Sequence, residues 1–273
     1  MIKNPRLVFS FFLISAVIFV ALASPIIAPN DPTLIDISQK FLEPTPKYPL
    51  GTDQFGRCVL SMLIYGARYS VGLAIPTLLI LAFIGTALGM LGAGLGGIFD
   101  KILITVCNIF MAFPPLVIVL TFINVLGQGI LNLLLSVILS MWVWFVKVIR
   151  SYVLEEKNKG YVTAAKISGC RDVEIMTEHI LPNIAPLLIT YFSTGVASII
   201  LMISGYSFLG LGLGADTPEW GAMLSNAKQY LYSKSMLIVY PGICIFLTSA
   251  GFNLFGEALR DILSPKEGYD AHG

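Results

Sequence analysis

With 273 residues, of which 56% are hydrophobic and only 12% charged, the chain lacks the composition of a soluble domain, where about 25% of residues are charged. Its net charge of +1 leaves no basic surface to neutralise phosphates, which excludes a nucleic-acid partner. Composition alone therefore indicates a protein of the lipid bilayer.

Several stretches without charged residues have the length that a membrane helix needs, about 20 residues. The run from Ile102 to Val146 is long enough for two crossings, and Gly127-Gln128-Gly129 supplies a turn between them. No soluble domain or internal repeat is visible. We therefore predict an all-α membrane protein with six transmembrane helices, at residues 7–28, 69–95, 102–126, 130–149, 184–211 and 236–256.

The first of these stretches has a second interpretation. Lys3 and Arg6 precede it and Ala21-Leu22-Ala23 resembles a cleavage site, so a signal peptide whose removal leaves five spans is the alternative. The apolar run continues past Ala23 to Ala28, however, which is longer than the apolar core of most signal peptides. We therefore expect the first helix to be retained.

The second and third spans carry residues that shape helix packing. Gly85 and Gly89, and likewise Gly92 and Gly96, are spaced four apart, which allows helices to approach closely in lipid. Pro114-Pro115 predicts a kink in the third span, because proline cannot donate a backbone hydrogen bond. A membrane helix tolerates this, since neighbouring helices can satisfy the freed carbonyls. We therefore expect a tightly packed second span and a kinked third one.

A charged segment from Lys147 to Asn183 separates the fourth and fifth spans. Tyr161, Ala164, Ala165 and Ser168 fall at helical spacing on one face, and three of the four are small. Such a face can seat in a groove of another protein. The alternative is an inert amphipathic connector.

The same segment contains signals that end one helix and start another. Gly169 stands where a C′ glycine with positive φ would end the first helix. Asp172 fits an N-cap, and Glu174 then lies in the first turn, where the helix dipole favours an acid. Pro182 is expected to end or kink the second helix. We therefore predict a helix–turn–helix that projects from the bilayer.

The orientation of the chain follows from the Lys and Arg residues in its loops. An even number of spans places both termini on one side, and that side carries 11 of the 17 Lys and Arg residues. We therefore predict that both termini and the loop 150–183 are cytoplasmic, and that the loops 29–68 and 212–235 are extracellular.

The order Thr163-Ala164-Ala165, Gly169 and His179-Ile180-Leu181-Pro182-Asn183 resembles the cytoplasmic signature of bacterial ABC-importer permeases. Thr163 replaces the usual glutamate and His179 the usual isoleucine, and the H-I-L-P-N form is similar to the peptide/nickel branch of that family. Three collinear segments resemble the same branch: LGTDQFGR at 50–57, AFPP at 112–115, and SFLGLG with PEWGAML between 207 and 224. The resemblance extends from the first span to Pro265.

This resemblance implies a fold, a location and a set of partners. The fold is that of a type I importer permease with cytoplasmic coupling helices, in a bacterial cell membrane. Residues 1–68 would form the first helix and an extracellular loop, 69–265 the permease domain with the coupling loop 150–183, and 266–273 a cytoplasmic tail. The partners would be a second homologous permease, two cytoplasmic ATPases that bind ATP and Mg, and an extracellular solute-binding protein, either a lipoprotein or periplasmic.

The resemblance also assigns roles to individual residues. The residues expected to contact the ATPase are Gly160, Thr163, Ala164, Ala165, Gly169, Asp172, His179, Leu181 and Pro182. Because they are uncharged and kinked, the third and fifth spans should line the translocation route, at Pro114, Met202, Ser204 and Ser207. An aspartate at position 204 should then impair transport without preventing assembly.

Several kinds of site are missing from the sequence. No Gly-x-x-x-x-Gly-Lys-[Ser/Thr] motif occurs, so ATP must be hydrolysed in another subunit. The spans carry no carboxylates, which argues against a proton- or sodium-driven carrier, although a stand-alone channel or secondary transporter remains the alternative. The 4 cysteines form no CxxC pair, and no catalytic or metal-binding cluster is visible, which argues against an intramembrane enzyme.

The substrate is the least determined property. Trp142-Val143-Trp144 and Ala227–Leu231 look closer to the nickel-type members of the branch than to its peptide carriers. A bare metal ion would want His or carboxylate ligands, which the spans hardly offer, whereas a chelated metal needs only a neutral polar path. We therefore expect nickel or a metal chelate, with a dipeptide or oligopeptide as the alternative.

Overall fold

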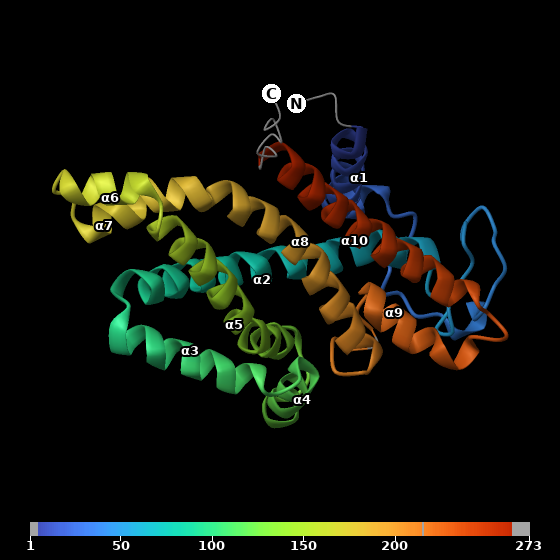
Figure 1. Ribbon diagram of the computed structural model, residues 1–273. Coiled ribbons are helices and arrows are strands. Elements are labelled where there is room, and N and C mark those ends of the chain that lie inside the picture. The colour runs from blue at the N-terminus through green and yellow to red at the C-terminus, as the bar shows by residue number, and fades with distance from the viewer. Residues whose placement is uncertain (1–4, 215, 264–273) are drawn as a thin grey trace.

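The computed structural model describes residues 5–214 and 216–263 of the chain. These residues form a helical bundle, and the only strand-like pairing among them is an isolated bridge between Thr52 and Cys58. The longer helices, shown in Figure 1, are α1 (Pro5–Ile27), α2 (Val59–Leu95), α3 (Gly97–Met111), α4 (Pro115–Leu126), α5 (Ile130–Lys157), α6 (Gly160–Ile167), α8 (Leu181–Phe208), α9 (Trp220–Ala227) and α10 (Met236–Leu263). The shorter ones are α7 (Asp172–Glu174), the π-helical η2 (Ile175–Ile180) and the 3-10 turns η1 (Ile37–Gln39) and η3 (Lys228–Tyr230).

The predicted all-α membrane fold is confirmed. Five helices of the described residues are long and apolar enough to cross a membrane: α1, α2, α5, the continuous helix from α7 to α8, and α10. The sixth candidate is a pair, α3 and α4, bent by 83° at the short break between them. The count of six holds when this bent pair is one span.

The break between α3 and α4 is sharper than the expected kink. Pro114 has extended backbone (φ −57, ψ 134) and forms the N-cap of α4. The residue before a proline is disfavoured in the helical region, and here Phe113 and Pro114 both precede one. Two consecutive prolines therefore interrupt the helix between Met111 and Pro115.

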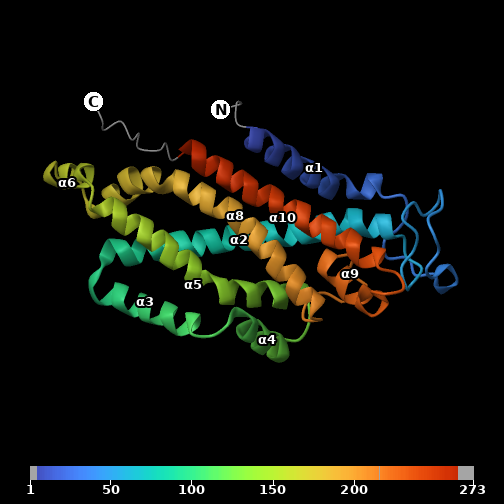
Figure 2. The ribbon, with the colours of Figure 1, turned by 45° about the vertical axis from the view of Figure 1, so that its right-hand side comes forward.

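The two ends of the bundle differ in what they carry. Figure 2 shows α6 at one end and α9 with the loop after α1 at the opposite end. Helix α1 begins, and α10 ends, toward the α6 end. This arrangement agrees with an even number of crossings.

The expected close packing of α2 is confirmed at three of the four glycines that predicted it. A Cβ at Gly85 would come within 2.6 Å of Phe145 Cβ on α5, and one at Gly89 within 3.0 Å of the α5 backbone. A Cβ at Gly92 would come within 2.7 Å of Leu103 on α3. Gly96 instead ends the helix with a φ of 64°. Helices α2 and α5 therefore touch almost backbone to backbone.

The LGTDQFGR segment folds as a turn around Asp53. The Asp53 carboxylate accepts hydrogen bonds from the Phe55 and Arg57 amides at 2.8 and 2.9 Å, and from the Arg57 guanidinium at 2.8 Å. Both charged side chains are buried. The loop 28–58 is therefore an ordered cap over the end of the bundle that carries α9.

Candidate functional site

The predicted coupling loop stands on an extension of α5. The helix continues past residue 149, where the expected span ends, to Lys157. The buried Glu156 then accepts hydrogen bonds from Lys159 Nζ at 2.5 Å and Tyr161 Oη at 2.6 Å. Burial and the Glu156 hydrogen bond raise the pKa of the Tyr161 phenol. This corner fixes the angle at which α6 leaves α5.

The turn after α6 confirms the prediction for Gly169, whose φ is +87°. The Gly169 amide donates to the Lys166 carbonyl at 3.1 Å, and the Cys170 amide donates to the Ala165 carbonyl at 3.1 Å. These two bonds form a Schellman motif, in which a C′ residue with positive φ ends the helix. A Cβ at Gly169 would meet no atom within 4 Å, so only its backbone conformation requires glycine.

The N-cap of the second helix differs from the expectation. Arg171 takes the N-cap position and Asp172 is the first helical residue. The Glu174 carboxylate reaches back to the Arg171 amide at 2.9 Å and pairs with its guanidinium at 2.6 Å. Glu174 therefore satisfies the amide at the helix start, which leaves Asp172 in the first turn, where an acid is still favoured.

The face of α6 that points outward also differs from the predicted one. Tyr161 and Ala165 pack against the loop's own buried residues, among them Val162 and Ile175. The exposed residues of α6 include Gly160, Thr163, Ala164 and Ile167, at helical spacing, with Ser168 in the turn. The predicted groove-binding face is therefore divided: Ala164 and Ser168 point outward, whereas Tyr161 and Ala165 face the interior of the loop.

Two residues at the tip of the loop were missed by the sequence reasoning. Ile167 is 83% exposed and Val173 is 71% exposed, although both are large and apolar. Exposed apolar side chains beside small residues are typical of a protein-binding surface. We call Gly160, Thr163, Ala164, Ile167 and Val173 the tip surface.

The remaining predicted coupling residues lie along the second helix. His179 and Leu181 are half-buried and Pro182 is exposed. Pro182 was expected to end or kink the second helix. It does not end it, because the chain passes from η2 directly into α8. The Leu181 amide donates to the Met176 carbonyl, five residues back, so a π-turn accommodates the proline that follows.

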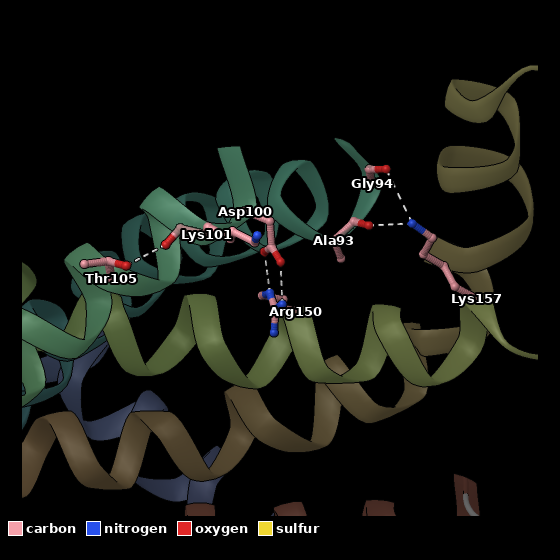
Figure 3. A network of polar contacts seen from close by, with 7 residues as sticks. All are labelled: Ala93, Gly94, Asp100, Lys101, Thr105, Arg150 and Lys157. Atoms are coloured by element: carbon pink, nitrogen blue, oxygen red, sulfur yellow. Dashed lines mark hydrogen bonds and ion pairs between the residues drawn. The ribbon is translucent and has the colours of Figure 1, made fainter. Parts of the chain in front are cut away.

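A polar network joins the end of α5 to the hairpin between α2 and α3 (Figure 3). The Arg150 guanidinium binds Asp100 through two hydrogen bonds of 2.5 and 2.6 Å. Lys157 Nζ donates to the carbonyls of Ala93 and Gly94 at 2.6 and 3.4 Å, at the C-terminal end of α2. We call Asp100, Arg150 and Lys157 the clamp. It links the base of the coupling loop to the start of the bent third span.

We expect the Asp100–Arg150 pair of the clamp to contribute measurably to stability. It is bidentate and partly buried, whereas the Glu43–Lys234 pair is exposed. Asp100→Asn and Arg150→Gln should lower the melting temperature non-additively, with a coupling energy of about 1 kcal/mol or more. The same cycle at Glu43 and Lys234 should give less than about 1 kcal/mol. Thermal melts of the detergent-purified subunit measure both cycles, and equal couplings would contradict the role of the clamp.

The four residues expected to line a translocation route differ in exposure. Pro114 is exposed at the break between α3 and α4, and Met202 is half-buried. Ser204 and Ser207 are buried in the chain's own packing. The expectation of an open route along these two serines therefore does not fit this arrangement.

The Ser204 hydroxyl instead faces a carboxylate that the sequence reasoning passed over. Glu219 is 0% exposed, and its Oε1 lies 3.3 Å from Ser204 Oγ on α8 and 3.2 Å from Ser70 Oγ on α2. It also accepts the amides of Gly221 and Ala222 at 2.8 Å, as the N-cap of α9. Glu219 therefore fastens α9 between α2 and α8. The sequence signal for this N-cap was Glu219 itself, an acid two residues before Gly221 in the PEWGAML segment.

Neutral polar side chains are exposed along the bent pair. They include Thr105 and Asn108 on α3 and Thr121 and Asn124 on α4. Thr105, Thr121 and Asn124 donate to carbonyls of their own helices, and Asn108 accepts from Lys147 at 3.1 Å. Such side chains are enriched where membrane helices face one another. This face of the bent pair therefore suits a partner helix or a water-filled route.

The comparisons with known proteins agree with this architecture. Residues 85–268 match the family described as the binding-protein-dependent transport system inner membrane component. The nickel transport system permease protein NikC of Escherichia coli K12 is 33% identical over 93% of this chain and 91% of its own length.

Two other relatives cover similar shares. The probable D,D-dipeptide transport system permease protein DdpC of Escherichia coli K12 is 34% identical over 97% of this chain and 89% of its own length. The metal-staphylopine import system permease protein CntC of Staphylococcus aureus is 34% identical over 91% of this chain and 86% of its own length. Like these relatives, this chain is a transport subunit and not an enzyme. The chain therefore belongs to the family of binding-protein-dependent inner membrane transport components, as a multi-pass permease subunit of the peptide/nickel ABC importers.

Proposed function

We propose that this chain forms half of the translocation route of an importer for nickel or a metal chelate. A second homologous permease would supply the other half, two ATPases would bind the cytoplasmic loops, and an extracellular binding protein would deliver the substrate. The observation that carries the proposal is the exposed, uncharged polar face of α3 and α4, next to the break at Pro114.

The tip surface supports the proposed attachment of the ATPase. It is apolar at Ile167 and Val173, small at Gly160 and Ala164, and held rigidly by the Schellman turn and the Glu156 corner. The clamp would carry a displacement of this surface to the start of α3. Energy would thus enter through the partner and reach the route through a few defined contacts.

The chemistry of the route favours a substrate that brings its own ligands. Residues 5–214 and 216–263 contain no group of three or more His, Cys, Asp or Glu side chains placed to hold a metal ion. A chelated metal is already coordinated and needs only neutral hydrogen-bonding groups, which Thr105, Asn108, Thr121 and Asn124 offer. Exposed Ser198 and Gly205, rather than Ser204 and Ser207, are the small residues that α8 would present to the route.

Uptake by the complete transporter tests the substrate. The two permeases, the ATPases and the binding protein are reconstituted in proteoliposomes with nickel alone, nickel–histidine or a dipeptide. We expect ATP-dependent accumulation of nickel, and more from the chelate than from the free ion. Uptake of the dipeptide alone would favour the peptide alternative. Dissociation constants of the purified binding protein provide an independent check.

Labelling of single cysteines tests the proposed orientation, with both termini cytoplasmic. In a variant without the 4 native cysteines, Thr45→Cys should react with an impermeant maleimide on intact cells, because it lies in the loop between α1 and α2. Asn158→Cys should react only after the cells are opened. The control is that both positions react fully in detergent. Labelling of position 158 on intact cells would reverse the orientation.

A further inference from the structure

A groove runs between α1 and α2 on the periphery of the bundle. It has a volume of about 370 Å³ and is lined by Ile18, Leu22 and Pro25 of α1 and by Gly72 and Ile75 of α2. A Cβ at Gly72 would meet no atom within 4 Å, so this glycine leaves the groove open without serving helix packing. Apart from Arg68, the groove is lined by apolar residues, as a site for an acyl chain requires.

One cation, Arg68, lies at the rim of this groove. Its side chain is exposed, and none of the residues that the structure describes forms a hydrogen bond or an ion pair with it. Arg68 directly precedes the uncharged run that starts at Tyr69, so it marks the boundary between headgroups and hydrocarbon. Ile75, at the deep end of the groove, is seven residues further, or about 10 Å along the helix.

A second cavity continues the groove away from the membrane. It has a volume of about 490 Å³ and is lined by polar groups that include Asp31 and the two aromatic side chains Tyr65 and Tyr69. Pro25 lines both cavities, and Tyr65, Arg68 and Tyr69 share one helix face at positions i, i+3 and i+4. Hydrogen bonds from Thr33 lower the pKa of the exposed Asp31, which therefore stays ionised.

The order of these features matches the order of groups in one class of lipid. From the membrane outward, the chain offers an apolar groove, a guanidinium and then a carboxylate. A phospholipid with an amine head group offers an acyl chain, a phosphate and then an ammonium. We propose that the α1–α2 groove binds such a lipid, phosphatidylethanolamine, in the outer leaflet. The leaflet assignment rests on the orientation proposed above, whereas binding itself does not.

The test uses the intact subunit in nanodiscs that contain equal amounts of phosphatidylethanolamine and phosphatidylglycerol. Native mass spectrometry counts the lipid molecules that remain bound to the subunit after it is released from the nanodisc. Arg68→Gln should reduce retained phosphatidylethanolamine by about tenfold or more, since it removes a charge-assisted hydrogen bond. Gly72→Leu should reduce it similarly by filling the groove, and Asp31→Asn should remove the preference over phosphatidylglycerol. Lys228→Gln, an exposed cation on the same side, is the matched control.

Two outcomes would overturn the proposal. Retention of phosphatidylethanolamine by both Arg68→Gln and Gly72→Leu at the level of the control would show that the groove does not hold it. Crosslinking of Gly72→Cys to the second permease in the assembled transporter would show that protein, not lipid, fills the groove. Neither outcome depends on transport activity, so a failure here leaves the proposed function untouched.

Discussion

Replacing Ala164 with tryptophan should abolish attachment of the ATPase while leaving the subunit folded. Ala164 is an exposed residue of the tip surface, so a larger side chain there would meet the partner first. An indole there would hold the two partner surfaces apart. We expect affinity for the ATPase to fall at least about 30-fold, the loss of an interface hot spot of about 2 kcal/mol. Co-purification of the ATPase and ATP-driven uptake in proteoliposomes measure the effect.

Two further variants make this result specific. Ile167→Asp should give the same loss by placing a charge on the apolar part of the tip surface. Thr177→Trp, at an exposed position of η2 outside that surface, should bind the ATPase normally. Ala165→Trp is a poorer test, because Ala165 packs inside the loop. Normal coupling in both Ala164→Trp and Ile167→Asp would mean that the loop only connects two spans.

Removing the Glu219 carboxylate should prevent the subunit from reaching its folded state. Glu219→Ala would orphan the Gly221 and Ala222 amides and two buried hydroxyls. Each orphaned buried donor costs about 1–3 kcal/mol, so the two amides and two hydroxyls together remove about 4–12 kcal/mol, most of a typical stability margin of about 5–15 kcal/mol. We expect little monodisperse protein in fluorescence-detected size-exclusion chromatography of solubilised membranes.

A graded series distinguishes this effect from a general loss of charge. Glu219→Gln keeps one acceptor oxygen and should fall between wild type and Glu219→Ala. Glu257→Ala, at an exposed position of α10, should behave as wild type. Ser204→Asp should now fail to assemble, because it would place a second carboxylate against the buried one. Wild-type amounts of Glu219→Ala would show that α9 is held by other contacts.

The sequence predicted the spans well because hydrophobicity is a property of each segment by itself. Uncharged runs located all five long helices, and the positive φ of Gly169 followed from its place after a helix-forming segment. The break at Pro114 was located but underestimated, because its size depends on two prolines that act in succession.

The outward face of the coupling loop could not be read from spacing alone. Ala164 and Ala165 are adjacent and equally small, so only the packing of α6 on Ile175 and Val162 decides which of them points outward. Glu219 and the clamp were missed for a similar reason. Glu219 contacts Ser70 across 149 residues, and Asp100 contacts Arg150 across 50, so no local pattern predicts either contact; only the Glu219 cap on the Gly221 amide is local.

The uninterrupted passage from α7 through η2 into α8 has a mechanical consequence. These elements form one helical rod of 37 residues, from Asp172 to Phe208, which is about 55 Å long. A stiff rod that is pushed at one tip must pivot, and its far end then swings the opposite way. The far end carries Ser204, whose hydroxyl bonds Glu219 at the start of α9. A push on Val173 would therefore arrive at the opposite face of the membrane as a tilt of α9, with the π-turn and Pro186 as the compliant points between them.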